Sequence, residues 1–77
     1  MKFKNISWDN NVVGYLTTPE KKLLAVIDTL LDKLDNCYVV INIDGGNKLC
    51  LYRNHKLVVS NMSVAKCYYL ILGMLTA

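Results

Sequence analysis

The middle of the chain decides the fold, and from Cys37 to Ser60 it reads CYVVINIDGGNKLCLYRNHKLVVS. Apolar side chains recur at every second position through much of this stretch, which is typical of half-buried β-strands. Two clusters of turn-forming residues interrupt it, Gly45-Gly46-Asn47 and Arg53-Asn54-His55. The stretch therefore predicts a three-stranded antiparallel meander, with strands over 37–44, 48–52 and 56–60.

The register of this meander follows from the loop length that gathers the apolar residues on one face. With three-residue loops, Ile43 pairs with Leu49, and Leu51 pairs with Leu57, whereas two-residue loops would scatter the apolar residues over both faces. We therefore expect three-residue loops and a core face made of Ile41, Ile43, Leu49, Leu51, Leu57 and Val59. The opposite face then mixes apolar, aromatic and polar side chains: Tyr38, Val40, Asn42, Lys48, Cys50, Tyr52, Lys56 and Val58.

A helix is predicted before the meander, and we expect it to end near Asn36. Thr18 can cap it, with Pro19 at the first helical position, where the missing N–H costs nothing. Alternatively, Thr17 and Glu20 form a capping box. Apolar residues then follow at three- and four-residue steps and make one stripe: Leu23, Leu24, Ile27, Leu30, Leu31 and Leu34.

A second helix is predicted at the end of the chain, from about Val64 to Leu75, with Ser60, Asn61 or Ser63 as its cap. It is apolar nearly all round, so it needs cover on more than one side. That cover can come from the groove between the sheet and the first helix, or from another subunit.

The N-terminal segment, Phe3 to Leu16, predicts strand, turn and strand, with the turn at Asp9-Asn10-Asn11. Together these elements predict the α+β class. The expected architecture is an antiparallel sheet, built from an N-terminal hairpin and a three-stranded meander, with two helices in the order ββαβββα. We expect residues 1–77 to form a single compact domain.

The composition restricts the function without defining it. Hydrophobic residues make up 53% of the 77 residues, which is ample for a packed core. Nine Lys and Arg against six Asp and Glu give a net charge of +3, with no basic run. This charge argues against an acidic mimic of DNA, and it permits a polyanionic partner without requiring one.

Three features indicate a cytoplasmic protein. The N-terminus has no apolar stretch of the signal-peptide type. Cys37, Cys50 and Cys67 are odd in number and lack the spacing of secreted proteins, which favours reduced thiols. The longest apolar stretch, from Val64 to Leu75, is shorter than the roughly 20 residues of a bilayer span, so we expect no membrane segment.

No residue pattern supports catalysis, a metal or a cofactor. His55 is the only histidine, and neither a nucleophile nor an orienting carboxylate lies near it in sequence. The three cysteines and His55 contain no short ligand pair, so zinc is disfavoured. Gly45-Gly46 precedes a strand rather than a helix, so it predicts a hairpin instead of a phosphate loop. We therefore expect a protein that is not an enzyme.

Asp28, Asp32 and Asp35 fall along one side of the first predicted helix. Like charges at this spacing repel slightly. The row is either a solvated helix flank or an acidic edge that meets a basic partner or a divalent cation.

Candidate partner-binding residues lie on the mixed sheet face and the terminal helix: Tyr38, Val40, Lys48, Tyr52, Arg53, Lys56, Tyr68 and Tyr69. Half-exposed Tyr, Val and Leu on a small domain are typical of a protein interface, with a homodimer compatible with the same residues. The alternative is a binder of nucleic acid or an anionic nucleotide, with Tyr38 and Tyr52 as stacking surfaces beside the cations.

No motif identifies a family, but the general character of the chain carries information. It is short, rich in Asn, Lys, Ile and Tyr, and free of catalytic groups. In these respects it resembles small phage and mobile-element proteins, many of which inhibit a host defence or regulatory protein by stoichiometric binding, as anti-CRISPR proteins do. The resemblance implies a host protein as the target and assigns no site.

Overall fold

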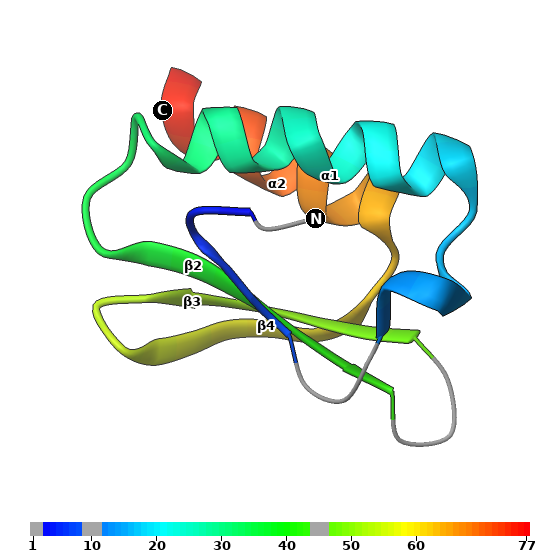
Figure 1. Cartoon of the computed structure of the whole chain (residues 1–77). Coiled ribbons are helices and arrows are strands. Elements are labelled where there is room, and N and C mark those ends of the chain that lie inside the picture. The colour runs from blue at the N-terminus through cyan, green and yellow to red at the C-terminus, as the bar shows by residue number, and fades with distance from the viewer. Residues whose placement is uncertain (1–2, 9–11, 44–46) are drawn as a thin grey trace.

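The computed structural model describes residues 3–8, 12–43 and 47–77. Four strands form one mixed sheet, in which strands that follow one another in the chain are also neighbours in space. β1 (Ile6–Trp8) runs parallel to β2 (Cys37–Ile43), while β3 (Asn47–Arg53) and β4 (Lys56–Met62) continue the sheet as antiparallel neighbours. Both α1 (Thr18–Leu31) and α2 (Val64–Thr76) lie on the same side of this sheet (Figure 1). The α+β class is confirmed, but the sheet is not purely antiparallel.

The predicted N-terminal hairpin is not formed by the described residues. Val12–Tyr15 forms a short 3-10 helix instead of a second strand, and the expected turn at 9–11 lies outside the described residues. β1 instead pairs directly with β2, which follows it in the chain after α1, and Ile6 lies opposite Val39. Parallel neighbours need a crossover of a dozen or more residues, usually a helix. α1 supplies that crossover, so the chain begins with a β-α-β unit.

A capping box of Thr17 and Glu20 begins α1, which confirms this alternative over a cap at Thr18. The Thr17 N–H donates to Glu20 Oε1 at 2.9 Å, and the Glu20 N–H donates to Thr17 Oγ1 at 3.3 Å. The hydrogen bond from the Thr17 backbone, and then the Thr17 side chain, lowers the pKa of Glu20. The helix ends at Leu31, earlier than predicted, and Asn36 instead adopts a positive φ of 57° in the following turn.

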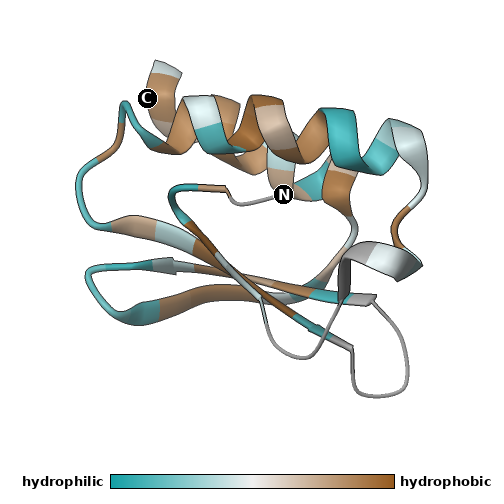
Figure 2. Ribbon diagram, in the orientation of Figure 1, coloured by the Kyte–Doolittle hydropathy of each residue, from teal (hydrophilic) through white to brown (hydrophobic). Residues whose placement is uncertain are grey.

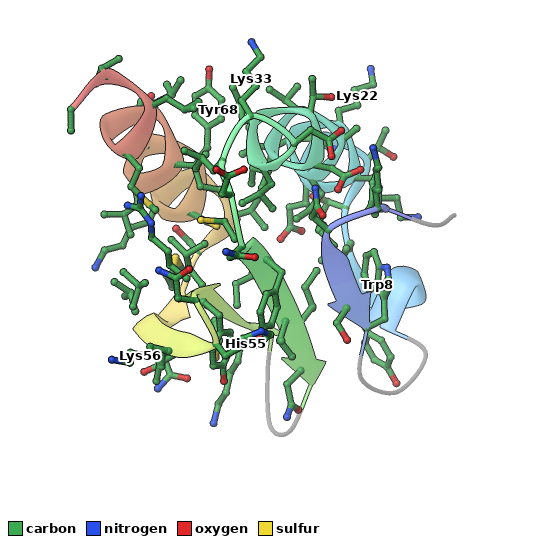
Figure 3. All side chains as sticks on the ribbon, turned by 90° about the vertical axis from the view of Figure 1, so that its left-hand side faces the viewer. Trp8, Lys22, Lys33, His55, Lys56 and Tyr68 are labelled. Atoms are coloured by element: carbon green, nitrogen blue, oxygen red, sulfur yellow. The ribbon has the colours of Figure 1, made fainter. Side chains whose placement is uncertain are left out.

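The predicted second helix is confirmed as α2. Ser63 is its N-cap, and the Ser63 hydroxyl accepts the Lys66 N–H at 3.2 Å. Only a single residue separates α2 from β4, so the helix must begin at the end of the sheet and return over it. It packs beside α1, which covers part of its apolar circumference (Figure 3).

The core fills the space between the helix layer and the sheet. Hydrophobic segments run along both helices and through the strands, while the turn between β3 and β4 is hydrophilic (Figure 2). The buried residues come from every strand, from both α-helices and from the segment before α1: Ile6, Leu16, Leu24, Ile27, Leu31, Cys37, Val39, Ile41, Leu49, Leu51, Met62, Val64, Cys67 and Ile71. None of the buried residues in the described part of the chain is polar or charged.

The register between β2 and β3 keeps the predicted faces. Ile41 pairs with Leu49, where Ile43 was expected. This shift of two residues leaves every side chain on its predicted face, because side chains alternate with a period of two. Ile43 pairs with Asn47, and residues 44–46, which include most of the predicted loop, lie outside the described residues.

The register between β3 and β4 differs from the prediction. Arg53 pairs with Lys56, which leaves a two-residue turn of Asn54 and His55 instead of a three-residue loop. Their φ angles of 53° and 63° are both positive, as a type I′ turn requires. In consequence Leu57, which was expected in the core, is 51% exposed.

Two register shifts then return β4 to the core face. Leu51 pairs with Val59, and Leu49 pairs with Met62. Each shift corresponds to a bulge, which accommodates extra residues on one strand. Val59 packs against the core and Met62 is buried within it.

Substitution of neighbouring residues on β3 tests this assignment of faces. Leu51 has no exposed surface, and Tyr52 lies half-buried on the other face. Leu51→Asp should unfold the domain, because an unpaired carboxylate in the core costs more than about 4 kcal/mol. Tyr52→Asp should remain folded with a modestly lower melting temperature, since a stacked aromatic pair is worth about 0.5–1.5 kcal/mol. A thermal melt followed by circular dichroism that gave the reverse order would refute the assignment.

Candidate functional site

The face of the sheet opposite α1 and α2 is covered by neither helix (Figure 1). Three cross-strand pairs of β2 and β3 lie along this face: Tyr38 with Tyr52, Val40 with Cys50, and Asn42 with Lys48. Each outer strand adds one residue, Ser7 of β1 opposite Val40 and Leu57 of β4 opposite Tyr52. Directly opposed residues point to the same side of a sheet. We call these eight residues the open sheet face.

An aromatic cluster occupies one end of the open sheet face. The rings of Tyr38 and Tyr52 stack with 5.1 Å between centroids and 6° between planes. The His55 ring lies 5.9 Å from that of Tyr38, tilted by 54°. The tyrosines are half-buried although no helix covers them, because each ring shields the other. This end of the face is therefore a preformed, amphipathic surface.

The centre and the far end of the open sheet face have different chemistry. Val40 and Cys50 are small, uncharged and half-buried, and Asn42 and Lys48 follow them. Of the eight residues, Lys48 alone carries a charge. The face thus changes from aromatic to apolar to cationic along the strands.

Leu57 extends the apolar surface to the edge strand, and Val58 follows it in β4. They are 51% and 47% exposed, which places two aliphatic side chains of β4 in solvent. The type I′ turn brings Leu57 opposite Tyr52. The sequence analysis missed Leu57 because it assumed a three-residue loop, although Asn54 at the first turn position is a signal for the shorter one.

The predicted basic and aromatic surface assembles only in part. Arg53 and Lys56 are paired one position beyond Tyr52 and Leu57, so alternation directs them to the other side of the hairpin. Arg53 also pairs with the buried Cys37. The assignment of Lys56 to the mixed face is therefore wrong. Of the three predicted cations, only Lys48 shares a face with the tyrosines.

The two predicted tyrosines of the terminal helix lie in the other layer of the molecule. Tyr68 packs against the core and Tyr69 is 70% exposed, with 5.5 Å between their ring centroids in an edge-to-face arrangement. Figure 3 shows Tyr68 in the helix layer, at the opposite end of the molecule from His55 and Lys56. The helix tyrosines and the sheet tyrosines therefore cannot contribute to one continuous surface.

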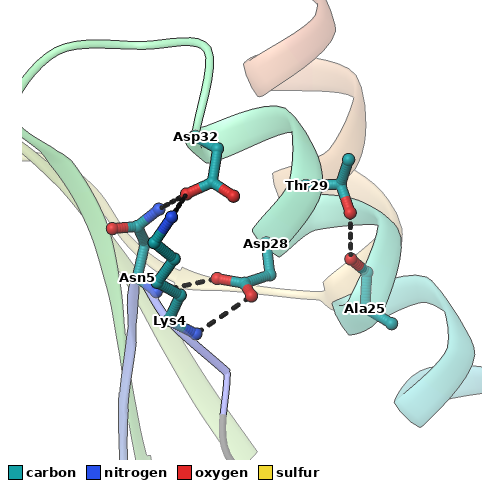
Figure 4. A network of polar contacts seen from close by, with 6 residues as sticks. All are labelled: Lys4, Asn5, Ala25, Asp28, Thr29 and Asp32. Carbon is teal, nitrogen blue, oxygen red and sulfur yellow. Dashed lines mark hydrogen bonds and ion pairs between the residues drawn. The ribbon is translucent and has the colours of Figure 1, made fainter.

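Two members of the aspartate row hold the N-terminal segment in place (Figure 4). Asp28 accepts hydrogen bonds from the backbone N–H of Lys4 at 2.9 Å and of Asn5 at 2.7 Å. Asp32 Oδ1 accepts from Asn5 Nδ2 at 2.7 Å and lies 3.5 Å from Lys4 Nζ. The role of Asp28 and Asp32 is thus structural, because they attach the start of β1 to α1. Asp35 is exposed in the loop after α1.

The three cysteines are free and occupy different environments. Cys37 and Cys67 are buried, whereas Cys50 is half-exposed on the open sheet face. Burial raises the pKa of the Cys67 thiol to about 11. Burial also raises the pKa of Cys37; the positive charge of Arg53 opposes this shift, and the negative charge of Asp35 adds to it.

Residues 3–8, 12–43 and 47–77 contain neither a cluster of metal ligands nor a pocket. No three of their His, Cys, Asp or Glu side chains lie close enough to hold a metal ion. Neither helix there has the length and hydropathy that a membrane span requires. His55 is exposed in its turn.

No family model, curated protein or solved structure matches the chain significantly.

The aspartate network makes a prediction about stability. Asp28→Asn puts an N–H donor where two backbone N–H groups now donate to carboxylate oxygens. We expect the free energy of unfolding to fall by about 1–3 kcal/mol, the usual cost of unsatisfied donors and lost charged hydrogen bonds. Asp35→Asn, the matched control, should change it by less than about 0.5 kcal/mol. Urea denaturation measures both, and equal effects would contradict a structural role for Asp28.

The cysteine environments predict a single fast thiol. Thiolate is the reactive species, so burial and a raised pKa slow Cys37 and Cys67. With a chromogenic disulfide reagent at neutral pH, one thiol per native chain should react quickly, and all three should react after denaturation. Cys50→Ser should abolish the fast phase. A fast phase that survives this substitution would show that Cys37 or Cys67 is accessible.

Proposed function

We propose that this chain is a small protein-binding module whose contact surface is the open sheet face together with Val58. The observation that supports this most is that both α-helices lie on one side of the sheet, while the uncovered side carries a stacked tyrosine pair and exposed aliphatic residues. Contiguous aromatic and apolar side chains at a surface are typical of protein interfaces. The chain would act by stoichiometric binding rather than catalysis.

The geometry favours a protein partner over a nucleic acid. Proteins that bind single strands use exposed aromatic faces on which bases stack, with cations along the backbone path. Here Tyr38 and Tyr52 stack on each other, so each ring offers at most one face. Arg53 and Lys56 are directed away from them, which leaves Lys48 as the cation on this face. The proposal that the target is a host defence or regulatory protein rests on length and composition.

Capture from a lysate of cells that encode the chain tests the proposed surface. The tagged chain should retain a protein partner through a high-salt wash, because apolar contacts depend little on salt. An untagged copy of the chain counts as such a partner. Leu57→Asp should abolish this retention, since it places a carboxylate on the open sheet face at a position already in solvent.

Val26→Asp is the matched control, because Val26 is 45% exposed on α1, in the other layer. It should retain the same protein as the unsubstituted chain. Loss of retention in Val26→Asp but not in Leu57→Asp would move the binding surface to the helix layer. Nucleic acid that is retained only at low salt would favour the alternative function.

A further inference from the structure

We propose that the partner on the open sheet face is a second copy of this chain, in a two-fold dimer that packs the two faces with their strands in opposite directions. This inference rests on the proposed function, because it names the occupant of the same surface. Closed two-fold dimers are the commonest oligomers, and their interface must be self-complementary.

The open sheet face contains both halves of a complementary contact. Lys48 supplies a cation at one end, and the stacked Tyr38 and Tyr52 supply aromatic rings at the other. Val40 and Cys50 lie midway between them. A cation above a tyrosine ring is attracted by the negative charge of the ring face. A second copy therefore satisfies the only charge on the face without any foreign group.

The position of the single cation selects between two arrangements of the dimer. A two-fold axis parallel to the strands would bring Lys48 near Lys48 of the other copy, where the charges repel. An axis across the strands reverses the second copy, so each Lys48 lies over the tyrosine pair of the other copy. This arrangement also brings the central pair of Val40 and Cys50 in one copy against the same pair in the other copy. Charge complementarity therefore favours the axis across the strands.

The size of the face predicts a weak dimer. Three seven-residue strands and the three-residue β1, at about 3.3 Å per residue and about 4.8 Å spacing, give a face of roughly 400 Å². A standard stable interface buries about 800 Å² on each partner, and smaller interfaces are usually transient. The exposed Leu57 and Val58 add apolar surface at the edge. We therefore expect a reversible dimer whose population rises with concentration.

Sedimentation equilibrium over a wide concentration range tests the dimer directly. The average mass of the unsubstituted chain should rise from that of one chain towards that of two. Val40→Asp should raise the dissociation constant at least about 100-fold, because it brings two carboxylates together in a desolvated centre. Val26→Asp, the same change in the helix layer, should leave the dissociation constant within about twofold.

Lys48→Ala tests the direction of the axis, because the two arrangements predict opposite signs. With the axis across the strands, Lys48→Ala removes two cations from above tyrosine pairs, one in each copy, and should weaken the dimer about fivefold to thirtyfold. With the axis along the strands, loss of the same charge would relieve repulsion and strengthen the dimer. A stronger dimer in Lys48→Ala would therefore overturn the proposed arrangement.

Cross-linking of the unsubstituted chain avoids any dependence on how a variant folds. Packed sheets lie about 10 Å apart and both thiols point into that gap, so a bismaleimide whose span is shorter than this spacing should join Cys50 to Cys50 of the second copy. Cys50→Ser should remove the cross-link. A chain that sediments as one copy at every concentration and gives no Cys50 cross-link overturns the inference. Capture of a different protein that depends on Leu57 would then still support the proposed function.

Discussion

The packing of both α-helices on one face of the sheet is the constraint on which the rest of the structure depends. α1 must cross from β1 to its parallel neighbour β2, and its buried stripe fixes the side on which it crosses. α2 follows β4 after Ser63 alone, and the buried Met62 and Val64 on either side hold that connection against the same core. The two helices then cover each other's flanks, which leaves the second face of the sheet without cover.

This arrangement also explains the use of the aspartate row. β1 has only three residues and pairs with β2 alone, so its ladder is short. Asp28 and Asp32 add hydrogen bonds that attach the residues before β1 to α1, which is the helix of the same crossover. The surface ion pair with Lys4 contributes little by comparison, since exposed pairs are worth about 0–1 kcal/mol. The charged-to-backbone hydrogen bonds are the stronger attachment.

Local signals in the sequence predicted local structure well and long-range pairing less well. The capping box of α1, the Ser63 cap of α2 and the core residues of β2 and β3 all follow from spacing and side-chain chemistry. The parallel pairing of β1 could not be read from its own residues, because it depends on where α1 places β2. The role of Asp28 was hidden for the same reason, since its hydrogen-bond donors lie more than twenty residues away.

The uncovered sheet can be approached at its edge or at its face, and β4 disfavours the edge. Its two register shifts and the positive φ of Asn61 interrupt the regular ladder that an added strand would need. Antiparallel sheets with one solvated face usually place polar residues there. Here Val40 and Leu57 lie on that face instead, and Val58 follows Leu57 in β4. Apolar residues at such positions gain favourable free energy when another surface covers them, which is why the proposed partner is placed across the face rather than along the edge.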